Sequence, residues 1–361
     1  MRLVCVAAVL AAAACGPFGG APDRGPGAGA SVAAPSPSAA TASSSGPAAA
    51  LVQVASPSTY AISLVFGDGH VVGPVTAQLR TTPPPATGAA PAAMPVFSAS
   101  DSRLYYLDGD TEVRFLDRDG SRGSAAHVPG GAHSQSGFAV SPDDRRIAVA
   151  AVDSSSSPAT THLYVEDVGG GGNHVDLPPS SGDRVWPVGW HAGELVLAVG
   201  SAPIQSVAGN PYGTFGGYEL VDASTGGRLG TLACNPAGPL TPAGSACLTG
   251  ASPLTVQDFA GRTRSPGGAP ASVVSAAEAP DGAHVAFCCL AGQLQLWDVE
   301  EGSVVSLGPA ASPAYGWIDA THLLVSDASV QHPRVMDVAT GAILPVAAAQ
   351  GRVVARVPGG L

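Results

Sequence analysis

Cysteines are the residues of this chain with the clearest capacity for chemistry, because thiols form disulfides, bind metals and carry redox reactions. The sequence has six cysteines, of which Cys234 and Cys247 bracket a loop rich in proline and glycine. A disulfide that closes a loop of this size contributes about 3 kcal/mol in the chain-entropy description. We therefore predict a bond between Cys234 and Cys247.

Cys288 and Cys289 are adjacent in the apolar stretch HVAFCCL. In a strand, neighbouring side chains point to opposite faces of the sheet. The interpretation that this favours is two small buried residues. A strained disulfide between the neighbours and a redox or metal role are the alternatives, although the Cys-x-x-Cys spacing of a metal site is missing.

Other segments that resemble chemical motifs lack essential parts. AHSQS (132–136) has neither glycine of the Gly-x-Ser-x-Gly elbow, and it precedes a strand instead of following one. The nine histidines are scattered without metal-site spacing. DGDTE (108–112) offers oxygen ligands for calcium but is too short for an EF-hand loop, and it fits a hairpin turn better. From the sequence we therefore predict that the protein is not an enzyme, with no catalytic residue, metal or cofactor.

The charge of the chain limits its partners. The 361 residues carry a formal net charge of −11, and all 16 basic residues are arginine. An acidic chain is a poor match for nucleic acid or for direct docking to anionic lipid. Basic or polymeric partners fit this charge better.

The N-terminal segment has the features of an export signal. Arg2 is followed by twelve uncharged residues, a stretch too short to span a bilayer and typical of a secretory signal. The following AAAC (12–15) resembles the lipobox of bacterial lipoproteins, which implies lipidation of Cys15. We expect a signal peptide over 1–15 and an exported protein anchored to the extracytoplasmic face of the cell membrane. Ordinary cleavage and free secretion is the alternative.

The next segment, 16–58, is rich in proline, alanine, glycine and serine and has two charges. Such composition cannot offset the entropy of ordering, so we predict a disordered linker. We expect the folded domain to occupy 59–361.

A repeat defines that domain. Six segments have a β-type run, an aspartate, and a glycine three or four residues later, and their aspartates are Asp117, Asp167, Asp222, Asp258, Asp298 and Asp337. Asp and Gly in this pattern close tight turns. A second β-type run precedes each aspartate, so a unit of about 40 residues has four strands. This period is typical of a β-propeller blade.

The ends of the domain complete the predicted ring. Residues 60–75 predict a hairpin across Gly-Asp-Gly, and 351–357 predict a final strand. A blade shared by these two segments would close the ring and remove its open edges. The sequence predicts an all-β single propeller with seven blades, with six as the alternative.

Two motifs carry a family resemblance. SPDDRRIAV (141–149) and APDGAHVAF (279–287) resemble the repeats of TolB-like periplasmic propellers, and LQLWDVEEG (294–302) resembles the ending of WD repeats. The resemblance covers roughly 96–347, with 241–261 as its poorest unit. It implies a monomeric propeller with another envelope or secreted protein as its partner.

Enzymatic propellers of the lactonase kind hold a metal in the central channel. Of the segments expected to line that channel here, only His191, Glu278 and Asp319 are ionisable, which favours binding over catalysis. Long insertions at 153–161, 201–217 and 326–334 are expected on one face, where recognition loops usually lie.

The candidate binding face comprises Tyr212, Phe215, His332, Trp190 and Trp317. The two tryptophans occupy equivalent positions and also fit a role as core between blades. We expect a non-catalytic protein-binding or scaffolding propeller, tethered to the outer face of the membrane. A lactonase-like channel enzyme and a sensor of sugar or cell-wall fragments are the alternatives.

Overall fold

The computed structural model describes residues 46–80, 92–156, 159–178, 184–200, 204–207, 215, 217–232, 234, 236–248, 254–267, 273–289, 293–308, 316–326, 333–346 and 349–361. These residues belong to one compact unit, Ser43–Leu361. The predicted signal peptide, Cys15 and most of the predicted linker lie outside them. The described parts consist of strands and turns, and they hold no helix of the length and apolarity needed to cross a bilayer.

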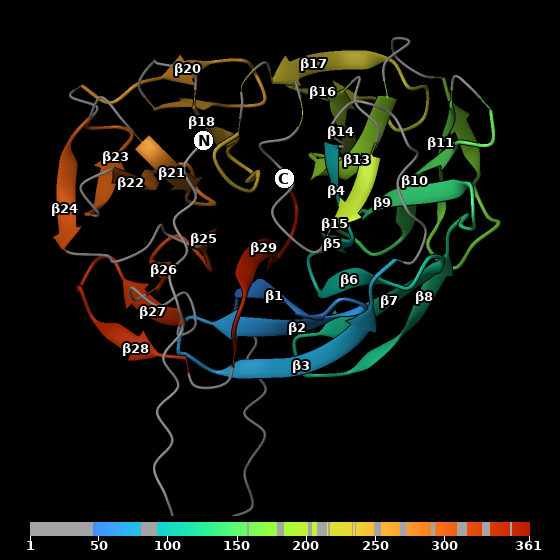
Figure 1. The fold of residues 1–361 in the computed structure, drawn as a ribbon. Helices are drawn as coiled ribbons and strands as arrows, with labels where there is room; N and C mark the ends of the chain where they lie inside the picture. The colour runs from blue at the N-terminus through green and yellow to red at the C-terminus, as the bar shows by residue number, and fades with distance from the viewer. Residues whose placement is uncertain are drawn as a thin grey trace, which may run out of the picture. The chain divides into compact units, whose positions relative to one another are not determined.

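Seven sheets form a ring, so the prediction of a seven-bladed propeller is confirmed (Figure 1). Blade 1 combines the two ends of the domain in the order β29 (Arg352–Val357), β1 (Ala48–Ser56), β2 (Thr59–Phe66), β3 (Val71–Gln78). The predicted hairpin and final strand therefore share one blade. β29 comes from the C-terminal end of the domain and pairs with β1 from its N-terminal end. This pairing within one blade closes the ring.

The next blades follow in chain order. Blade 2 has β5 (Phe97–Ala99), β6 (Arg103–Asp108), β7 (Glu112–Asp117) and β8 (Arg122–His127). Blade 3 has β9 (Ser134–Val140), β10 (Arg146–Asp153), β11 (Thr160–Asp167) and β12 (Val175–Leu177). Blade 4 has β13 (Arg184–His191), β14 (Glu194–Gly200), β16 (Gly217–Val221) and β17 (Arg228–Leu232).

The remaining blades complete the circle. Blade 5 has β18 (Ser245–Cys247), β19 (Thr255–Gln257) and β20 (Thr263–Arg264). Blade 6 has β21 (Val273–Glu278), β22 (His284–Cys289), β23 (Leu294–Asp298) and β24 (Val304–Gly308). Blade 7 has β25 (Gly316–Trp317), β26 (His322–Ser326), β27 (Pro333–Asp337) and β28 (Ile343–Pro345).

The six predicted Asp–Gly turns are confirmed between the third and fourth strands of blades 2 to 7. In each, the glycine N–H donates to the aspartate carbonyl at 2.8–3.0 Å. Each glycine has a φ between +71° and +90°, a region that side chains with a Cβ rarely adopt. The repeat is therefore a backbone requirement of the turn, as expected for a structural motif.

Blade 5 departs from the pattern in its inner strand. Residues 236–241, PAGPLT, run beside β18 through isolated bridges from Pro236 to Cys247 and from Thr241 to Gly244. Two prolines interrupt regular pairing because each lacks a donor N–H. A Cβ on Gly238 would lie 2.7 Å from the carbonyl oxygen of Ala276, so this irregular strand packs closely on blade 6.

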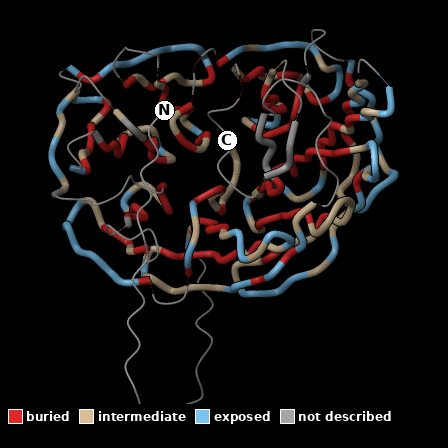
Figure 2. Tube along the Cα trace, viewed as in Figure 1, coloured by how far each residue is buried: buried red, intermediate tan, exposed pale blue. Residues whose placement is uncertain are grey.

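The core lies between the blades. Buried apolar side chains form five clusters, each shared by neighbouring blades, and burial decreases toward the outer strands (Figure 2). One cluster joins blade 7 to blade 1 through Ile318 and Val353. The ring is thus continuous through apolar contact as well as through strand pairing.

The predicted boundary of the linker at residue 58 is corrected by β1, because Ala48–Ser56 forms a strand of blade 1. Its first five residues, AAALV, are buried between β29 and β2. Small side chains suit a strand covered on both faces, yet in sequence an alanine run resembles a low-complexity spacer. This resemblance accounts for the error.

A further pair of strands lies outside the blades. β4 (Ala92–Pro95), before blade 2, pairs in parallel with β15 (Ile204–Val207), from the long insertion of blade 4. The insertion at 201–217 is therefore joined through its backbone to the segment that enters blade 2.

The predicted disulfide is present between Cys234 and Cys247, whose Cα atoms lie 5.6 Å apart. It connects the entry of the irregular inner strand of blade 5 to β18. Replacing both cysteines by serine should lower the free energy of unfolding by about 3 kcal/mol and the melting temperature by roughly 5–10 °C. Thermal unfolding monitored by circular dichroism measures this effect. If a reductant leaves the wild-type midpoint unchanged, the bond contributes nothing.

Candidate functional site

The central channel is narrow and mostly apolar. Its cavity has a volume of about 60 Å³ and is lined by inner strands of six blades, through small or apolar residues such as Ala99, Val188 and Ala277. This volume is well below the roughly 300–1,000 Å³ of typical ligand sites. Glu278 and Arg356 are the ionisable residues of its lining.

The C-terminal segment 358–361 covers one mouth of this channel. Gly359 N donates to Ser100 O at the end of β5, and Leu361 N donates to Trp190 O near the end of β13. His191 Nδ1 lies 2.7 Å from Leu361 O. The segment therefore crosses from blade 1 to blade 4 along the ends of the inner strands, and it fills part of the channel mouth.

Of the three ionisable channel residues named from sequence, Glu278 and His191 line one groove beside the channel, whereas Asp319 lines neither the groove nor the channel cavity. Glu278 lines the channel cavity, whereas His191 lies at its edge, bonded to Leu361. Asp319 closes the turn after β25, where its Oδ1 accepts from the backbone N–H groups of Thr321 and His322. Burial alone would raise the pKa of Asp319, but these hydrogen bonds hold the pKa below its usual value. The Asp319 carboxylate thus makes these hydrogen bonds within its own turn.

Among the residues that the structure describes, no three His, Cys, Asp or Glu side chains are grouped so as to hold a metal ion. The acidic turn 108–112 is the predicted hairpin turn, between β6 and β7. Its carboxylates pair with arginines, Asp108 with Arg114 at 3.1 Å and Asp110 with Arg80 at 3.3 Å.

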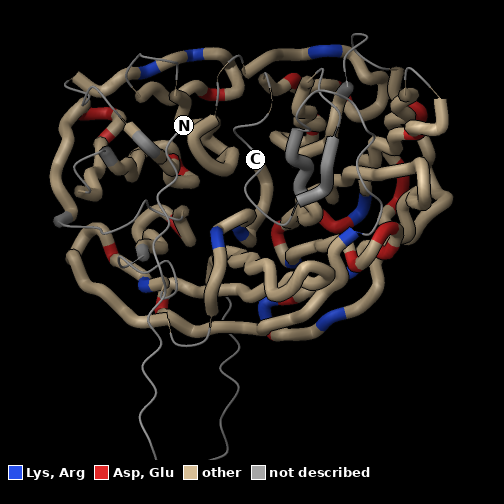
Figure 3. Tube along the Cα trace, viewed as in Figure 1, with Lys and Arg blue, Asp and Glu red and all other residues tan. Residues whose placement is uncertain are grey.

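Arg356 is a channel residue that the sequence analysis missed. It lies on β29 and lines the same cavity as Glu278. Burial lowers the pKa of its guanidinium, partly offset by the charges of Asp319 and Asp101. The sequence signal was an arginine within the apolar run VVARV. Figure 3 shows how the charged positions are distributed along the trace.

The environment of Glu278 strongly perturbs its carboxyl group. Its side chain is buried at 5% exposure, and its Oε2 has no hydrogen-bond partner in the described part of the chain. Burial, followed by the charges of Asp258 and Asp281, raises its pKa to about 8. Glu278 is therefore mainly protonated at neutral pH.

A larger groove lies between blades 5 and 6, on the face that carries the turns between first and second strands. It has a volume of about 400 Å³ and shares Glu278 with the channel cavity. Ligand sites typically occupy 300–1,000 Å³, so the groove falls within that range and the channel does not.

Blade 5, which borders the groove, has short strands in the residues that the structure describes. Its three described strands have three, three and two residues, shorter than the corresponding strands of blade 6. The poor match of 241–261 to the repeat was the sequence signal of this irregularity.

The walls of the groove combine an aromatic stack and an ion pair. The ring of Phe259 stacks on His191 with centroids 3.9 Å apart. Arg262 Nε donates to Asp258 Oδ2 at 2.6 Å, and Arg262 N donates to Asp258 Oδ1 at 2.8 Å. Burial alone would raise the pKa of Asp258, but these bonds from Arg262 lower it overall. Asp258 thus lines the groove as a carboxylate whose charge is compensated by Arg262.

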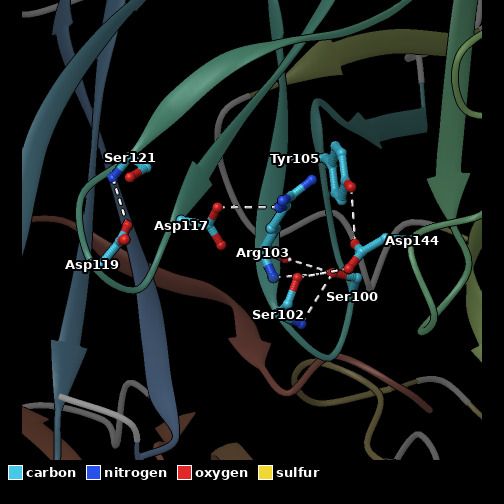
Figure 4. A network of polar contacts seen from close by, with 8 residues as sticks. All are labelled: Ser100, Ser102, Arg103, Tyr105, Asp117, Asp119, Ser121 and Asp144. Atoms are coloured by element: carbon cyan, nitrogen blue, oxygen red, sulfur yellow. Dashed lines mark hydrogen bonds and ion pairs between the residues drawn. The ribbon is translucent and has the colours of Figure 1, made fainter. Parts of the chain in front are cut away.

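A second polar network joins blades 2 and 3 (Figure 4). The carboxylate of Asp144 accepts from Ser102 Oγ at 2.6 Å and from the Tyr105 hydroxyl at 2.8 Å. Arg103 pairs with Asp117 at 3.2 Å. Asp144 occupies the turn after β9 with a φ of +62°, so these bonds hold the SPDDRR turn against the neighbouring blade. These hydrogen bonds hold blade 2 against blade 3 and are structural contacts.

The residues of the candidate binding face lie in different environments, and two of them lie outside the described residues. Tyr212 and His332 lie outside the described residues. Phe215 is buried and packs edge-on against Tyr218, with centroids 6.3 Å apart. A role for these three residues in binding stays a prediction.

Trp190 and Trp317 are buried equivalents in two blades. Trp190 Nε1 donates to Ala139 O at 3.2 Å, and Trp317 Nε1 donates to Ala277 O at 2.9 Å. Each acceptor is on the inner strand of the preceding blade. This geometry makes both indoles contacts between blades, although Trp317 also borders the channel cavity.

Trp317→Phe should lower the free energy of unfolding by about 1–2 kcal/mol more than Trp297→Phe does. The reason is that only Trp317→Phe removes a hydrogen bond that is present in the structure. Trp297 is equally buried, and its Nε1 has no partner in the described residues. Chemical denaturation of both variants gives the difference. Equal losses would show that the Trp317 bond contributes little.

Cys288 is buried in β22, in the predicted strand. The side chain of Cys289 lies outside the described parts, so the state of the adjacent pair stays a prediction.

No protein-family model and no curated protein matches this chain. Among solved structures, one chain of the "Crystal Structure of Mitotic Checkpoint Complex" aligns with a TM-score of 0.46 and 14% identity. The alignment covers 78% of this chain and 87% of that chain. The assignment of seven blades rests on the strand pairing described above.

Proposed function

We propose that this chain is a non-catalytic, protein-binding propeller that recognises its partner in the groove between blades 5 and 6. One observation carries the proposal: the groove has ligand-site volume and contains a buried carboxyl oxygen without a partner in the described chain. Buried polar groups are almost always hydrogen-bonded, and an exception requires an explanation. A group supplied by a bound partner is the explanation that we propose.

The rest of the fold supports recognition by a rigid surface. Turns held by repeated hydrogen bonds surround the groove, so binding would order little additional chain. The net charge of −11 favours partners of opposite charge. The insertion at 201–217 is a second predicted contact region.

We also propose that the propeller is tethered to the outer face of the cell membrane through a lipid on Cys15. The support is the AAAC sequence at 12–15 after a short apolar segment. In the native host, Cys15→Ser should move the protein from the membrane fraction to the medium or the soluble fraction. Retention of this variant in the membrane would contradict the tether.

Crosslinking on intact cells tests the binding role. Ala260 is an exposed groove residue in the turn between β19 and β20, and Ala260→Trp should obstruct the groove. Ala339→Trp is the matched control, because Ala339 is exposed in the corresponding turn of blade 7. We expect one envelope protein to copurify with wild type and with the control, and to be lost with Ala260→Trp. No enriched protein with any of the three would contradict a scaffold.

One observation favours a second function, the lactonase-like enzyme. A protonated carboxyl at neutral pH is suited to general acid catalysis, and Glu278 has a raised pKa beside the channel. A cavity of about 60 Å³ is, however, too small for an organic substrate. Hydrolysis of simple lactones by wild type but not by Glu278→Gln would establish the enzyme and displace the binding role.

A further inference from the structure

Three carboxyl groups line the blade 5–6 groove, and one of them has an oxygen without a hydrogen-bond partner in the described residues. Asp258 is paired with Arg262, and Asp281 Oδ1 accepts from Ala283 N at 3.0 Å. Glu278 Oε2 is buried without such a partner among the described residues. Glu278 is therefore the group whose bonding a ligand would complete.

The position of the Glu278 carboxyl is fixed by the turn that follows it. A Cβ on Gly282 would lie 3.8 Å from Glu278 Oε1 and 2.7 Å from the Cβ of Ala243, so Gly282 brings the turns of blades 5 and 6 together above the carboxyl. Gly282 has a φ of +71° and its N–H donates to Ala279 O at 2.9 Å. The carboxyl is thus held beneath two turns that both line the groove.

The basic groups around Glu278 are directed elsewhere. Arg262 is held by Asp258, and His191 is bonded to Leu361 and stacked on Phe259. On the channel side, the charges that act on Arg356 are those of Asp319 and Asp101. The charges that act on Glu278 are only those of Asp258 and Asp281, both negative.

Two further groups complete the electrostatic surroundings. Arg264 lines the groove from β20, where its side chain is exposed to solvent. His284, on the strand paired with β21, lies 4.0 Å from Asp298 and faces the ring of Trp317. Near Glu278 the groove is therefore acidic, while Arg262 lies in the turn before β20 and Arg264 lies on β20.

We infer that the groove binds a lysine or arginine side chain of the protein partner, and that its cationic group bonds Glu278. The inference rests on the proposed function and specifies the chemistry of the partner. The negative charge of Asp281 and the Glu278 carboxylate would both attract a cation, whereas they would repel an anion. The apolar stem of such a side chain has Val256, Phe259 and Val299 beside it.

Binding of the cation is coupled to loss of a proton. The carboxyl O–H bond of Glu278 breaks, the proton passes to bulk water, and the carboxylate accepts N–H bonds from the bound ammonium or guanidinium. Glu278 is protonated below pH 8 in the free protein, because burial and two acids raise its pKa. As pH increases, affinity should therefore rise by up to about tenfold per pH unit between the pKa of Glu278 in the complex and its pKa in the free protein, and it should level off outside that range.

Capped tripeptides test this chemistry on the intact chain. The probes are Gly-Arg-Gly, Gly-Lys-Gly and the uncharged Gly-citrulline-Gly, each acetylated and amidated. The readout is the ¹³C chemical shift of the Glu278 carboxyl, assigned by its absence in Glu278→Gln, followed from pH 5 to pH 10.

We expect saturating Gly-Arg-Gly or Gly-Lys-Gly to lower the pKa of Glu278 by at least one unit, and Gly-citrulline-Gly to leave it unchanged. The affinity of Glu278→Gln for the basic peptides should be at least tenfold lower and independent of pH. Glu301→Gln is the control, since Glu301 is an exposed carboxylate in a turn of blade 6, and it should behave as wild type. An unchanged pKa of Glu278, equal binding of the citrulline peptide, or full affinity of Glu278→Gln would overturn the inference.

The outcomes separate this inference from the proposed function. If Glu278→Gln still captures the envelope partner while Ala260→Trp does not, the groove is the recognition site and the cation does not bond Glu278. If neither the wild type nor any variant captures a partner, the proposed function itself fails.

Discussion

Val354→Asp is expected to abolish cooperative folding of the propeller. Val354 is fully buried on β29, the strand that closes the ring, and packs in the cluster shared by blades 1 and 2. A carboxylate at this position would be buried without a partner, a change that commonly costs more than about 4 kcal/mol. Ring closure would be lost together with the blade. Thermal unfolding followed by circular dichroism should show no cooperative transition.

Arg352→Asp provides the control on the same strand, because Arg352 is exposed and its replacement buries no charge. This variant should melt within a few degrees of wild type, as surface changes usually alter stability by about 0.5 kcal/mol or less. A cooperative transition of Val354→Asp near the wild-type temperature would show that β29 is not needed to close the ring.

Glu278→Gln is expected to change the dependence of stability on pH. The folded state holds the Glu278 proton up to a pKa of about 8, whereas the usual value is 4.5. Between these values the folded state binds more protons than the unfolded state, so the contribution of Glu278 makes stability fall as pH rises. The full loss is on the order of 5 kcal/mol at about 1.4 kcal/mol per pKa unit.

Urea denaturation at pH 4.5, 6.5 and 8.5 measures this difference. Relative to wild type, Glu278→Gln should become progressively more stable as pH rises from 4.5 to 8.5. Glu301→Gln should show no such trend, since Glu301 is exposed. A constant difference between Glu278→Gln and wild type across this range would mean that Glu278 titrates normally in the folded protein.

Local signals in the sequence predicted the parts of the fold that depend on local structure. A turn that needs a positive φ selects glycine wherever it occurs, so the Asp–Gly pattern located one turn in each of six blades. The disulfide was predictable because both cysteines lie close together in sequence around one loop. Closure by β29 followed from the need to remove open edges.

The groove was not predictable from the sequence, because it depends on packing between two blades. Its lining comes from turns and strands of blades 5 and 6 that are distant in sequence, such as Ala243 and Gly282. Glu278 was identified as an ionisable channel residue. Its missing partner is a property of the assembled ring, in which the available arginines are directed toward other acids.

Site-specific photocrosslinking from the groove tests the central claim most directly. A photoreactive amino acid at Arg264, an exposed groove residue, is compared in intact cells with one at Arg145, exposed in a turn of blade 3 on the same face. Recognition in the groove predicts one protein attached at 264 and not at 145, with a lysine or arginine in the attached peptide. Attachment at both positions alike, or at neither, would contradict the groove as the site where a partner binds.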